Sequence, residues 1–293
     1  MRRVLITGIN GYIGQYLYLS RLKHVRTEGS IRNADTEFGN FIDPLTSLHH
    51  FNLRLDIESQ LKHINTDILI HTAAMANLGL CQKNPQLADQ VNAQATMSIA
   101  RWCRKNAVRF IYLSTDIVFD GEHPPFSEND NPNPVNVYGS SKLKGENAVQ
   151  EYAENYAIIR IALGMGKGKF QRSNFVDWVI NKINKAEQIP LYEDEFRTAS
   201  PLPYLVNNIW RIALSEARGI FHQFGAKRLS RYEIGKLICK ELNSGMELLR
   251  PVKAAELQDY PRPLDVSLTT DREIDGKKLI LPGIDEVIKE III

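Results

Sequence analysis

The stretch "RVLITGINGYIGQYLYLSRL", residues 3–22, decides the fold. Residues 3–7 are a short apolar run that predicts a buried strand, and the segment from Tyr12 onward predicts a helix. Between them, Gly8, Gly11 and Gly14 are spaced three residues apart. Such glycines permit a tight turn and close approach to a pyrophosphate, and the helix N-terminus supplies N–H groups and partial positive charge. The stretch therefore predicts a dinucleotide-binding turn at the start of an α/β domain.

The following chain repeats the alternation of strand and helix. Strands are predicted at 66–74, 109–115 and 156–162, and helices at 84–106 and 138–153. This rhythm predicts an α/β fold with a doubly wound parallel sheet of Rossmann type. After Gly164 the rhythm changes, and helices are expected up to about 186, from about 204 and near 230–242. We therefore predict a dinucleotide-binding domain over 1–162 and a smaller C-terminal α/β substrate lobe over 163–293, with a boundary blurred by chain crossings.

The composition excludes several classes of protein. The 293 residues include 36 basic and 34 acidic side chains, a net charge of +2, which does not favour nucleic acid or an anionic membrane as partner. The three cysteines are widely spaced and form no Cys-x-x-Cys, as is typical of a reducing compartment. No apolar stretch approaches the length of a membrane span, so a cytoplasmic protein is expected. The seven histidines show no metal-binding spacing, and His49 and His50 are expected in a loop.

The segment "VRTEGSIRN" bears on which dinucleotide the turn binds. An NAD site usually places a carboxylate about 20 residues after the glycines, on the ribose 2′-hydroxyl, and Glu28 has that separation. We expect the strand to end near Gly29 and Ser30, so that Ser30 and Arg32 face the ribose. A cation there accommodates a 2′-phosphate, which favours NADPH and leaves NADH possible. The alternative for Arg32 is a solvated surface arginine.

In "NVYGSSKLKGE", Tyr138 and Lys142 are four residues apart on a predicted helix, so their head groups share one face. Taken alone, this pair is weak evidence of function. A tyrosine has a pKa of about 10, so proton transfer near pH 7 requires help of roughly 4 kcal/mol. A neighbouring ammonium gives that help because it stabilises the phenolate.

Three segments together resemble the extended short-chain dehydrogenase/reductase family: "TGINGYIG", "HTAA" and "YLSTDIVFDG…NPNPVNVYGSSK". The last of these is similar to the dTDP-4-dehydrorhamnose reductase branch, which "PLPYLVNNI" and "RPLDVSL" resemble more loosely. The resemblance implies the catalytic set Thr115, Tyr138 and Lys142. Tyr138 would donate a proton to the developing alkoxide, Thr115 would hydrogen-bond the same oxygen, and Lys142 would also reach the nicotinamide ribose.

The resemblance also implies the residues that bind the cofactor. Asn92 is expected near the active-site strands, with helix–sheet packing as the alternative. Asp56 is expected at the adenine pocket, with a turn cap as the alternative. Arg160 is expected either near the cofactor or in a structural salt bridge. The full expected set is Gly8, Asn10, Gly11, Tyr12, Ile13, Gly14, Ser30, Arg32, Asp56, Ile57, Thr72, Ala73, Ala74 and Asn92, with Tyr138 and Lys142.

The expected reaction is NAD(P)H-dependent reduction of a keto group on a nucleotide-linked sugar. Asp116 is a candidate substrate contact, and Arg197 and Arg262 are candidate anchors for the diphosphate. Family dehydratases carry Asp-Glu after the threonine, and Ile117 at the glutamate position argues against dehydration. Two alternatives stay open: a sugar-nucleotide epimerase that holds NAD, and a non-catalytic dinucleotide-binding regulatory subunit. A homodimer is also left open.

Overall fold

The computed structural model describes residues 1–32, 42–169, 174–257 and 260–292. The chain divides into two compact units. Unit 1 contains Met1–Ser114, Asn136–Arg160 and Ile209–Phe221, and unit 2 contains Thr115–Val135, Ile161–Asn208 and His222–Ile293. These ranges differ from a single cut after residue 162, because 115–135 belongs to unit 2 and 209–221 to unit 1. Each unit is described by itself below.

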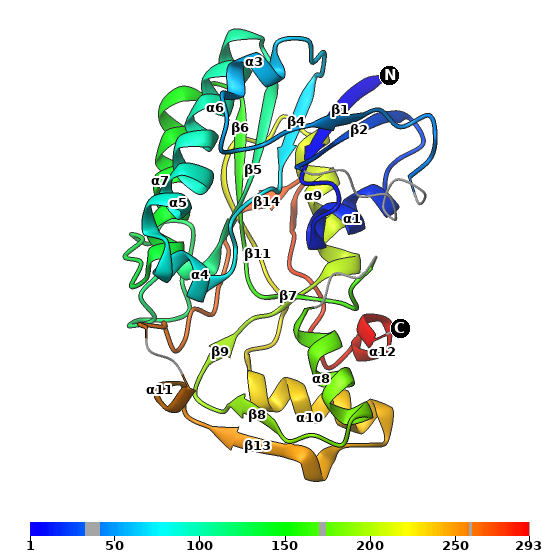
Figure 1. Cartoon of the computed structure of the whole chain (residues 1–293), viewed down its shortest axis with the longest axis vertical. Helices are drawn as coiled ribbons and strands as arrows, with labels where there is room; N and C mark the ends of the chain where they lie inside the picture. The colour runs from blue at the N-terminus through cyan, green and yellow to red at the C-terminus, as the bar shows by residue number, and fades with distance from the viewer. Residues whose placement is uncertain (33–41, 170–173, 258–259, 293) are drawn as a thin grey trace. The chain divides into compact units, whose positions relative to one another are not determined.

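Unit 1 is built on a seven-stranded sheet with the strand order β11-β6-β5-β4-β1-β2-β3 (Figure 1). The pairs β1–β2, β1–β4, β2–β3 and β4–β5 are parallel. The predicted fold class, a Rossmann-type α/β fold, is confirmed. The strands are β1 (Arg2–Thr7), β2 (Val25–Ile31), β3 (Leu48–His50), β4 (Ile68–His71), β5 (Arg109–Thr115), β6 (Tyr156–Ile161) and β11 (Gly219–Gln223). The helices are α1 (Tyr12–Leu19), α3 (Ile57–Leu61), α4 (Leu78–Lys83), α5 (Pro85–Asp89), α6 (Ala95–Lys105) and α7 (Val137–Tyr152).

The strand order reverses between β1 and β4. From β1 the chain builds β2 and β3 on one side, and it then crosses to build β4, β5 and β6 on the other. Open α/β sheets bind ligands where the order reverses, beyond the carboxyl ends of the strands. The glycine turn follows β1, and Thr72–Ala74 follow β4, so the topology places both segments at this point.

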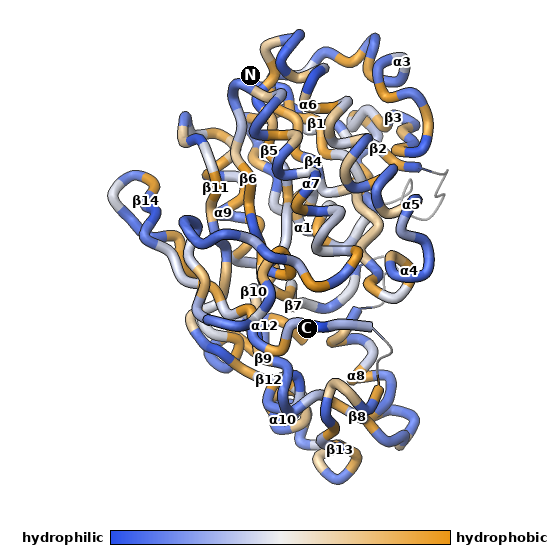
Figure 2. The backbone as a smooth tube through the Cα atoms, turned by 90° about the vertical axis from the view of Figure 1, so that its left-hand side faces the viewer, coloured by the Kyte–Doolittle hydropathy of each residue, from blue (hydrophilic) through white to orange (hydrophobic). Residues whose placement is uncertain are grey.

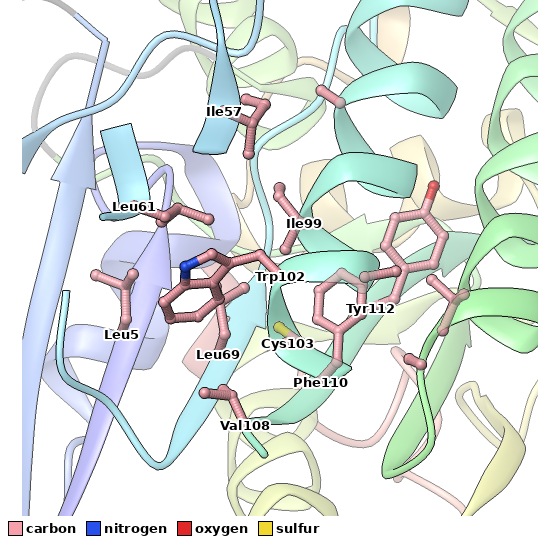
Figure 3. Close-up of a cluster of buried hydrophobic side chains, with 14 of the residues drawn as sticks. Leu5, Ile57, Leu61, Leu69, Ile99, Trp102, Cys103, Val108, Phe110 and Tyr112 are labelled. Carbon is pink, nitrogen blue, oxygen red and sulfur yellow. The ribbon is translucent and has the colours of Figure 1, made fainter. Parts of the chain in front are cut away.

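Helices cover both faces of this sheet (Figure 1). On one face α3, α6 and α7 enclose an apolar core in which Trp102 packs among Leu5, Leu61 and Leu69 (Figure 3). On the other face lie α1 and the second half of α9 (Leu202–Leu214), where the Trp210 indole N–H donates to the Leu17 carbonyl at 3.2 Å. The central strands are coloured mainly as hydrophobic in Figure 2, and every residue of β5 is buried. Such continuous apolar runs are expected for strands covered on both faces.

One expectation about unit 1 was wrong, and another was incomplete. His49 and His50 lie in the short edge strand β3, where Ser30 of β2 pairs with His49, and not in a loop. The helix predicted over 84–106 is interrupted by a π-helical turn, η1 (Gln90–Gln94), between α5 and α6. The apolar residues that predicted the helix are mostly four apart, and residues at this spacing lie on one face in an α-helical and in a π-helical turn alike, so the pattern did not reveal η1.

Unit 2 has its own apolar core of residues from α8, β8, α10 and α12. Helix α10 begins with a capping box, in which Ser230 and Glu233 bond each other's backbone N–H groups. The helices expected up to about 186, from about 204 and near 230–242 are present as α8, α9 and α10. The helices are α8 (Phe175–Asn184), α9 (Leu202–Leu214), which continues into unit 1, α10 (Arg231–Leu242), α11 (Ala254–Leu257) and α12 (Ile288–Ile292), with 3-10 turns η2 (Asp116–Val118) and η3 (Met246–Leu248). The strands are β7 (Gly164–Met165), β8 (Ile189–Tyr192), β9 (Phe196–Arg197), β10 (Ser200–Pro201), β12 (Leu229–Ser230), β13 (Leu249–Val252), β14 (Glu273–Ile274) and β15 (Lys277–Lys278).

Candidate active site

The glycine turn of unit 1 has no room for side chains. A Cβ atom on Gly14 would lie 2.2 Å from the Gly8 carbonyl oxygen, and one on Gly8 would lie 3.0 Å from Ala73. Gly8 also has a φ of +67°, in the left-handed region that favours glycine. Gly11 caps α1 without a side-chain hydrogen bond, and the first turn of α1 carries no acidic residue. The turn thus leaves the helix N-terminus suited to a phosphate group, which fits the expected dinucleotide.

The loop after β4 is tied to this turn. The Thr72 hydroxyl donates to the Thr7 carbonyl at 2.7 Å and approaches the Gly8 carbonyl at 3.4 Å. Ala73 and Ala74 continue the loop, and Ala73 packs against Gly8. The structure therefore brings the predicted "HTAA" segment onto the predicted glycine turn.

The residues at the end of β2 show which of Glu28 and Arg32 is better placed to contact the cofactor ribose. The strand continues to Ile31, slightly beyond the expected end, and Arg32 is the exposed residue that follows. Ser30 is buried, and its carbonyl accepts from the Ile9 N–H at 3.1 Å. Glu28 is also buried, and its carboxylate contacts His49 Nε2 at 2.9 Å and Arg26 Nε at 3.1 Å. Because the Glu28 carboxylate already has two partners, Arg32 remains the better candidate for contact with the ribose 2′ position of the cofactor.

Asp56 and Ile57 have structural roles in unit 1. The exposed Asp56 carboxylate caps α3, where it accepts from the Glu58 N–H at 3.1 Å, so the alternative of a cap is what the structure shows. The hydrogen bond from Ser59 is the main cause that lowers the pKa of Asp56. The Ile57 side chain is buried in the apolar core (Figure 3). A cofactor contact by Ile57 stays a prediction, and it would have to be made by other atoms than this buried side chain.

Asn92 lies in the π-helical turn and is buried. Its side-chain oxygen accepts from the Met75 N–H at 2.8 Å, and its amide donates to the Met75 carbonyl at 3.0 Å. The same amide donates to Ser141 Oγ at 2.9 Å on α7. Asn92 thus joins the loop after β4 to the helix that carries Tyr138 and Lys142.

Helix α7 presents Tyr138 and Lys142 four residues apart. Asn136 caps its start by accepting from the Gly139 N–H at 2.9 Å. Tyr138 is half-buried, whereas Lys142 is 3% exposed. The Lys142 ammonium donates to the Leu113 carbonyl at 2.7 Å and lies 4.0 Å from the centre of the Tyr112 ring. Burial lowers the pKa of Lys142 to about 7, and the charge of Glu146 opposes that shift.

Arg160 belongs to a buried salt bridge in unit 1. Its Nη2 donates to Glu146 Oε2 at 2.8 Å and its Nε to Oε1 at 3.1 Å, and both side chains are almost fully buried. Ser114 donates to the same carboxylate at 2.5 Å. The alternative of a structural salt bridge is what the structure shows. Glu146 is thereby engaged by Arg160, although it lies one helical turn after Lys142.

In unit 2, the Thr115 hydroxyl contacts the residue that follows it. It donates to Asp116 Oδ1 at 3.1 Å and accepts from the Ile117 N–H at 3.2 Å. Asp116 is buried, and its Oδ2 lies 3.5 Å from Arg197 Nε. Burial raises the pKa of Asp116 to about 6, although Arg197 opposes the shift.

Three arginines of unit 2 surround one fully buried carboxylate, that of Glu195. Arg197 Nη2 lies 3.5 Å from Oε1, Arg231 Nε lies 3.3 Å from the same oxygen, and Arg262 Nη2 lies 2.6 Å from Oε2. Burial alone would raise the pKa of Glu195, but the three guanidinium groups outweigh it and bring the pKa to about 2. We call Asp116, Glu195, Arg197, Arg231 and Arg262 the arginine cluster.

The arginine cluster differs from the prediction that Arg197 and Arg262 anchor the diphosphate, because Arg197 is already engaged by other groups. Arg197 is buried, and its guanidinium group pairs with the carboxylates of Asp116 and Glu195. It also donates hydrogen bonds to the carbonyls of Phe196 and Pro263. Arg231, which the sequence analysis missed, contacts Glu195 through Nε and the Phe175 ring at 4.9 Å, and its side chain is 17% exposed. An arginine at the first position of a helix, opposed to the helix dipole, was the available signal.

Comparison with known proteins agrees with this geometry. A family model described as RmlD substrate binding domain matches residues 1–291. The chain belongs to this family. The predicted resemblance to the dTDP-4-dehydrorhamnose reductase-like branch of the extended short-chain dehydrogenases is therefore confirmed.

Individual relatives have different names. The chain is 28% identical over 283 residues to methionine adenosyltransferase 2 subunit beta of Bos taurus, covering 92% of this chain and 81% of that protein. It is 27% identical over 263 residues to the probable low-salt glycan biosynthesis reductase Agl14 of Haloferax volcanii, covering 88% and 85%. The crystal structure of dTDP-4-dehydrorhamnose reductase from Bacillus anthracis in complex with NADP has a TM-score of 0.83 at 26% identity, covering 99% and 98%.

No group of histidine, cysteine, aspartate or glutamate side chains in the described part of the chain is arranged to hold a metal ion. Among the described helices, none is long and apolar enough to cross a membrane.

Proposed function

We propose that this protein is a reductase that uses NADPH to reduce a keto group on a nucleotide-linked sugar. The observation that carries the proposal is the arrangement on α7, where Lys142 is buried one helical turn after Tyr138 and its pKa is about 7. A family relative named as a reductase and the reductase structure with NADP support it. The three buried thiols agree with a cytoplasmic location, which we also propose.

In the proposed mechanism, Tyr138 donates a proton to the sugar oxygen as the keto group is reduced. The Lys142 ammonium stabilises the resulting phenolate, and its burial strengthens that effect because the local dielectric constant is low. The Thr115 hydroxyl hydrogen-bonds the sugar oxygen and orients it. When bound, NADPH supplies the hydride. The glycine turn, Thr72–Ala74 and Asn92 belong to the elements that hold it.

The proposed substrate site lies in the arginine cluster. Arg231 and Arg262 are the partly exposed members, and they are proposed to bind the diphosphate in place of the buried Arg197. The arginine cluster contains two carboxylates and three guanidinium groups. With both carboxylates ionised, it has a net positive charge although its side chains are largely shielded from water. Such an excess is costly unless an anion neutralises it.

A panel of nucleotide sugars, including 4-keto sugars, tests the proposal through NADPH oxidation followed by absorbance. We expect turnover with at least one keto sugar, and Tyr138→Phe should reduce the rate below about a tenth while NADPH binding is retained. Inversion at carbon 4 without net NADPH consumption would instead indicate an epimerase.

The cofactor preference has its own test. Arg32→Ala should weaken NADPH binding about 10-fold and leave NADH little changed, because only the 2′-phosphate loses a charged partner. Apparent affinities for both cofactors decide this. An equal loss for both would mean that Arg32 does not read the ribose.

A second candidate is a non-catalytic regulatory subunit that binds a dinucleotide. The observation that favours it is the similarity to methionine adenosyltransferase 2 subunit beta. The presence of Thr115, Tyr138 and Lys142 argues against it without settling the choice. NADPH binding without turnover on the whole panel would favour this second candidate.

A further inference from the structure

His71 is a buried titratable residue for which the proposed mechanism has no role. It ends β4, in the "HTAA" segment, and is 1% exposed. Both ring nitrogens have partners, since Nδ1 lies 2.7 Å from Thr7 Oγ1 and Nε2 lies 3.4 Å from Thr96 Oγ1. These partners belong to β1 and α6, so the imidazole bridges two elements that are far apart in sequence.

The directions of the hydrogen bonds fix the tautomer. Thr96 donates its only hydroxyl proton to the Asn92 carbonyl at 2.8 Å, so it can only accept from His71 Nε2. Nε2 therefore carries the proton, and Nδ1 accepts from Thr7. Thr7 in turn accepts from the Ala73 N–H at 3.5 Å. With the proton on Nδ1 instead, the buried Thr7 hydroxyl would lose the acceptor that the structure gives it.

One end of this chain of hydrogen bonds lies beside the glycine turn, and the other end contacts α7, the helix that carries Tyr138 and Lys142. At one end, Thr7 immediately precedes Gly8 and lies against the Thr72–Ala74 loop. At the other end, Asn92 is bonded to Ser141, whose hydroxyl donates to the Tyr138 carbonyl at 2.8 Å. All of these residues are in unit 1. The chain of bonds thus runs from the phosphate-binding turn to the helix of the proposed proton donor.

The imidazole also lies near the charge of Lys142. The His71 ring stacks on the Tyr112 ring with centres 5.9 Å apart, and the same ring contacts the Lys142 ammonium (Tyr112 is labelled in Figure 3). Burial first, and then the charge of Lys142, lower the pKa of His71 to about 3. The other ring neighbour, Phe110, and the two threonines carry no charge. A second positive charge beside Lys142 is thereby avoided.

We propose that His71 is a positioning residue: a neutral imidazole, protonated on Nε2, that holds the glycine turn and the π-helical turn of Asn92 in register. Its two ring nitrogens are the middle of a directional chain of hydrogen bonds that connects these turns, and the imidazole contacts no ligand. Any effect of His71 on turnover would rest on the proposed function, whereas the tautomer and the effect on cofactor binding do not.

Nitrogen-15 NMR of the imidazole side chains tests the tautomer directly. The His71 signals are assigned by their loss in His71→Asn. We expect Nδ1 to resonate as an unprotonated nitrogen and Nε2 as a protonated one, unchanged from pH 8 to pH 5. A proton on Nδ1, or titration of His71 in this range, would overturn the proposal.

The positioning role is tested by removing the Thr96 hydroxyl, which interrupts the chain of hydrogen bonds. Thr96→Val should weaken NADPH binding about 3- to 10-fold, although Thr96 lies on α6 and outside the glycine turn. Thr96→Ser, which keeps the hydroxyl, should bind as the wild type does. Ser98→Ala is the matched control, because Ser98 also donates to the carbonyl four residues earlier, at 3.2 Å, but is only half-buried and has no bond to His71. Equal NADPH affinities for Thr96→Val and Ser98→Ala would show a merely structural threonine and overturn the role.

A double-mutant cycle completes the test. His71→Asn keeps an acceptor for Thr7, but its short amide cannot reach Thr96. In that background Thr96→Val should have no further effect on NADPH affinity, whereas additive losses would contradict a shared chain of bonds. If this pattern is found but no nucleotide sugar is reduced, the proposed reaction fails and the role of His71 stands. Absence of NADPH binding by the wild type would overturn both.

Discussion

At the scale of single residues, the candidate site depends on ionisable groups held away from water. Lys142 and Asp116 are each 3% exposed, and their pKa values are displaced towards neutrality, to about 7 and about 6. For both groups burial is the main cause, because it disfavours the charged form. Burying these charged groups is expected to cost stability, and proteins accept such a cost most often at functional sites.

Lys142→Met is expected to stabilise the fold while it abolishes turnover. The folded pKa of Lys142, about 7, lies below its ordinary 10.5, so the unfolded chain binds more protons between these values. The cost of burying the lysine is fully present below pH 7 and disappears as pH rises through 10.5. Denaturant unfolding should show a gain of about 1–3 kcal/mol at pH 6.5 that shrinks by pH 9.5.

Lys144→Met is the control for this prediction, because Lys144 is exposed and pairs with Asp89 at the surface. Its effect on the free energy of unfolding should not change between pH 6.5 and 9.5. A Lys142→Met variant less stable than wild type at pH 6.5 would refute the claim that the buried ammonium is costly.

Asp116→Asn is expected to remove a pH dependence from the reduction. While Asp116 is ionised, it takes the proton of Thr115, and protonation near pH 6 frees that proton for the sugar oxygen. Arg197, Glu195 and Arg231 are the charges that act on Asp116. The wild-type rate of reduction should rise as pH falls through 6, and the variant should lack this rise. Asp120→Asn, in the same segment, should keep the wild-type profile.

At the scale of elements, the site depends on how a turn meets the helix or strand beside it. Gly14 lies in the first turn of α1, directly against the carbonyl of Gly8. Asn92 lies in a π-helical turn that aims its side chain at two other segments. In both places local backbone geometry, more than any single contact, holds the neighbouring segments together.

Gly14→Ala should displace α1 from the turn. The new methyl group would meet backbone atoms at 2.2 and 2.8 Å, and backbone cannot move aside as a flexible side chain can. We expect a loss of about 1–3 kcal/mol in stability and at least about a 10-fold loss in NADPH affinity. Gly11→Ala, with its nearest atom at 3.0 Å, should be milder in both measurements. Equal effects would show that this packing does not control the turn.

At the scale of the whole molecule, the two units supply different parts of the proposed function. Unit 1 holds the glycine turn and α7, whereas unit 2 holds Thr115 and the arginine cluster. The chain passes between the units at Ser114–Thr115, within the "YLSTD" segment, so one short motif serves both. Cofactor binding and substrate binding should therefore respond separately to substitution.

Arg231→Ala should weaken binding of a nucleoside diphosphate about 10-fold and leave NADPH affinity unchanged, as measured by calorimetry. The reason is that, among the described residues, Arg231 contacts Glu195 through Nε, which leaves its two terminal nitrogens without a hydrogen bond to that part of the chain. Arg228→Ala is the matched control, because Arg228 lies three residues earlier but is engaged by Asp265 at 2.6 Å. If both variants bind the diphosphate equally well, the cluster is structural.

The sequence by itself determined the fold and the placement of Tyr138 and Lys142 on one helix. The glycine spacing, the strand–helix alternation and the Tyr138–Lys142 interval are local patterns, and each depends only on backbone geometry over a few residues. For this reason the sheet, α7 and the family could be predicted before any contact was known. Ile57 shows the limit of this approach, because a motif position does not reveal which way a side chain points.

Only the tertiary structure decided which charges are paired. Glu195 is a single acidic residue in the sequence, but in the fold it gathers Arg197, Arg231 and Arg262, whose positions along the chain span more than sixty residues. The contacts of His71 with Thr7 and Thr96, and of Glu28 with His49, were hidden for the same reason, since these partners come from other strands and helices. Burial and partners set the charge state of a group, and both arise from contacts between segments that no local pattern records.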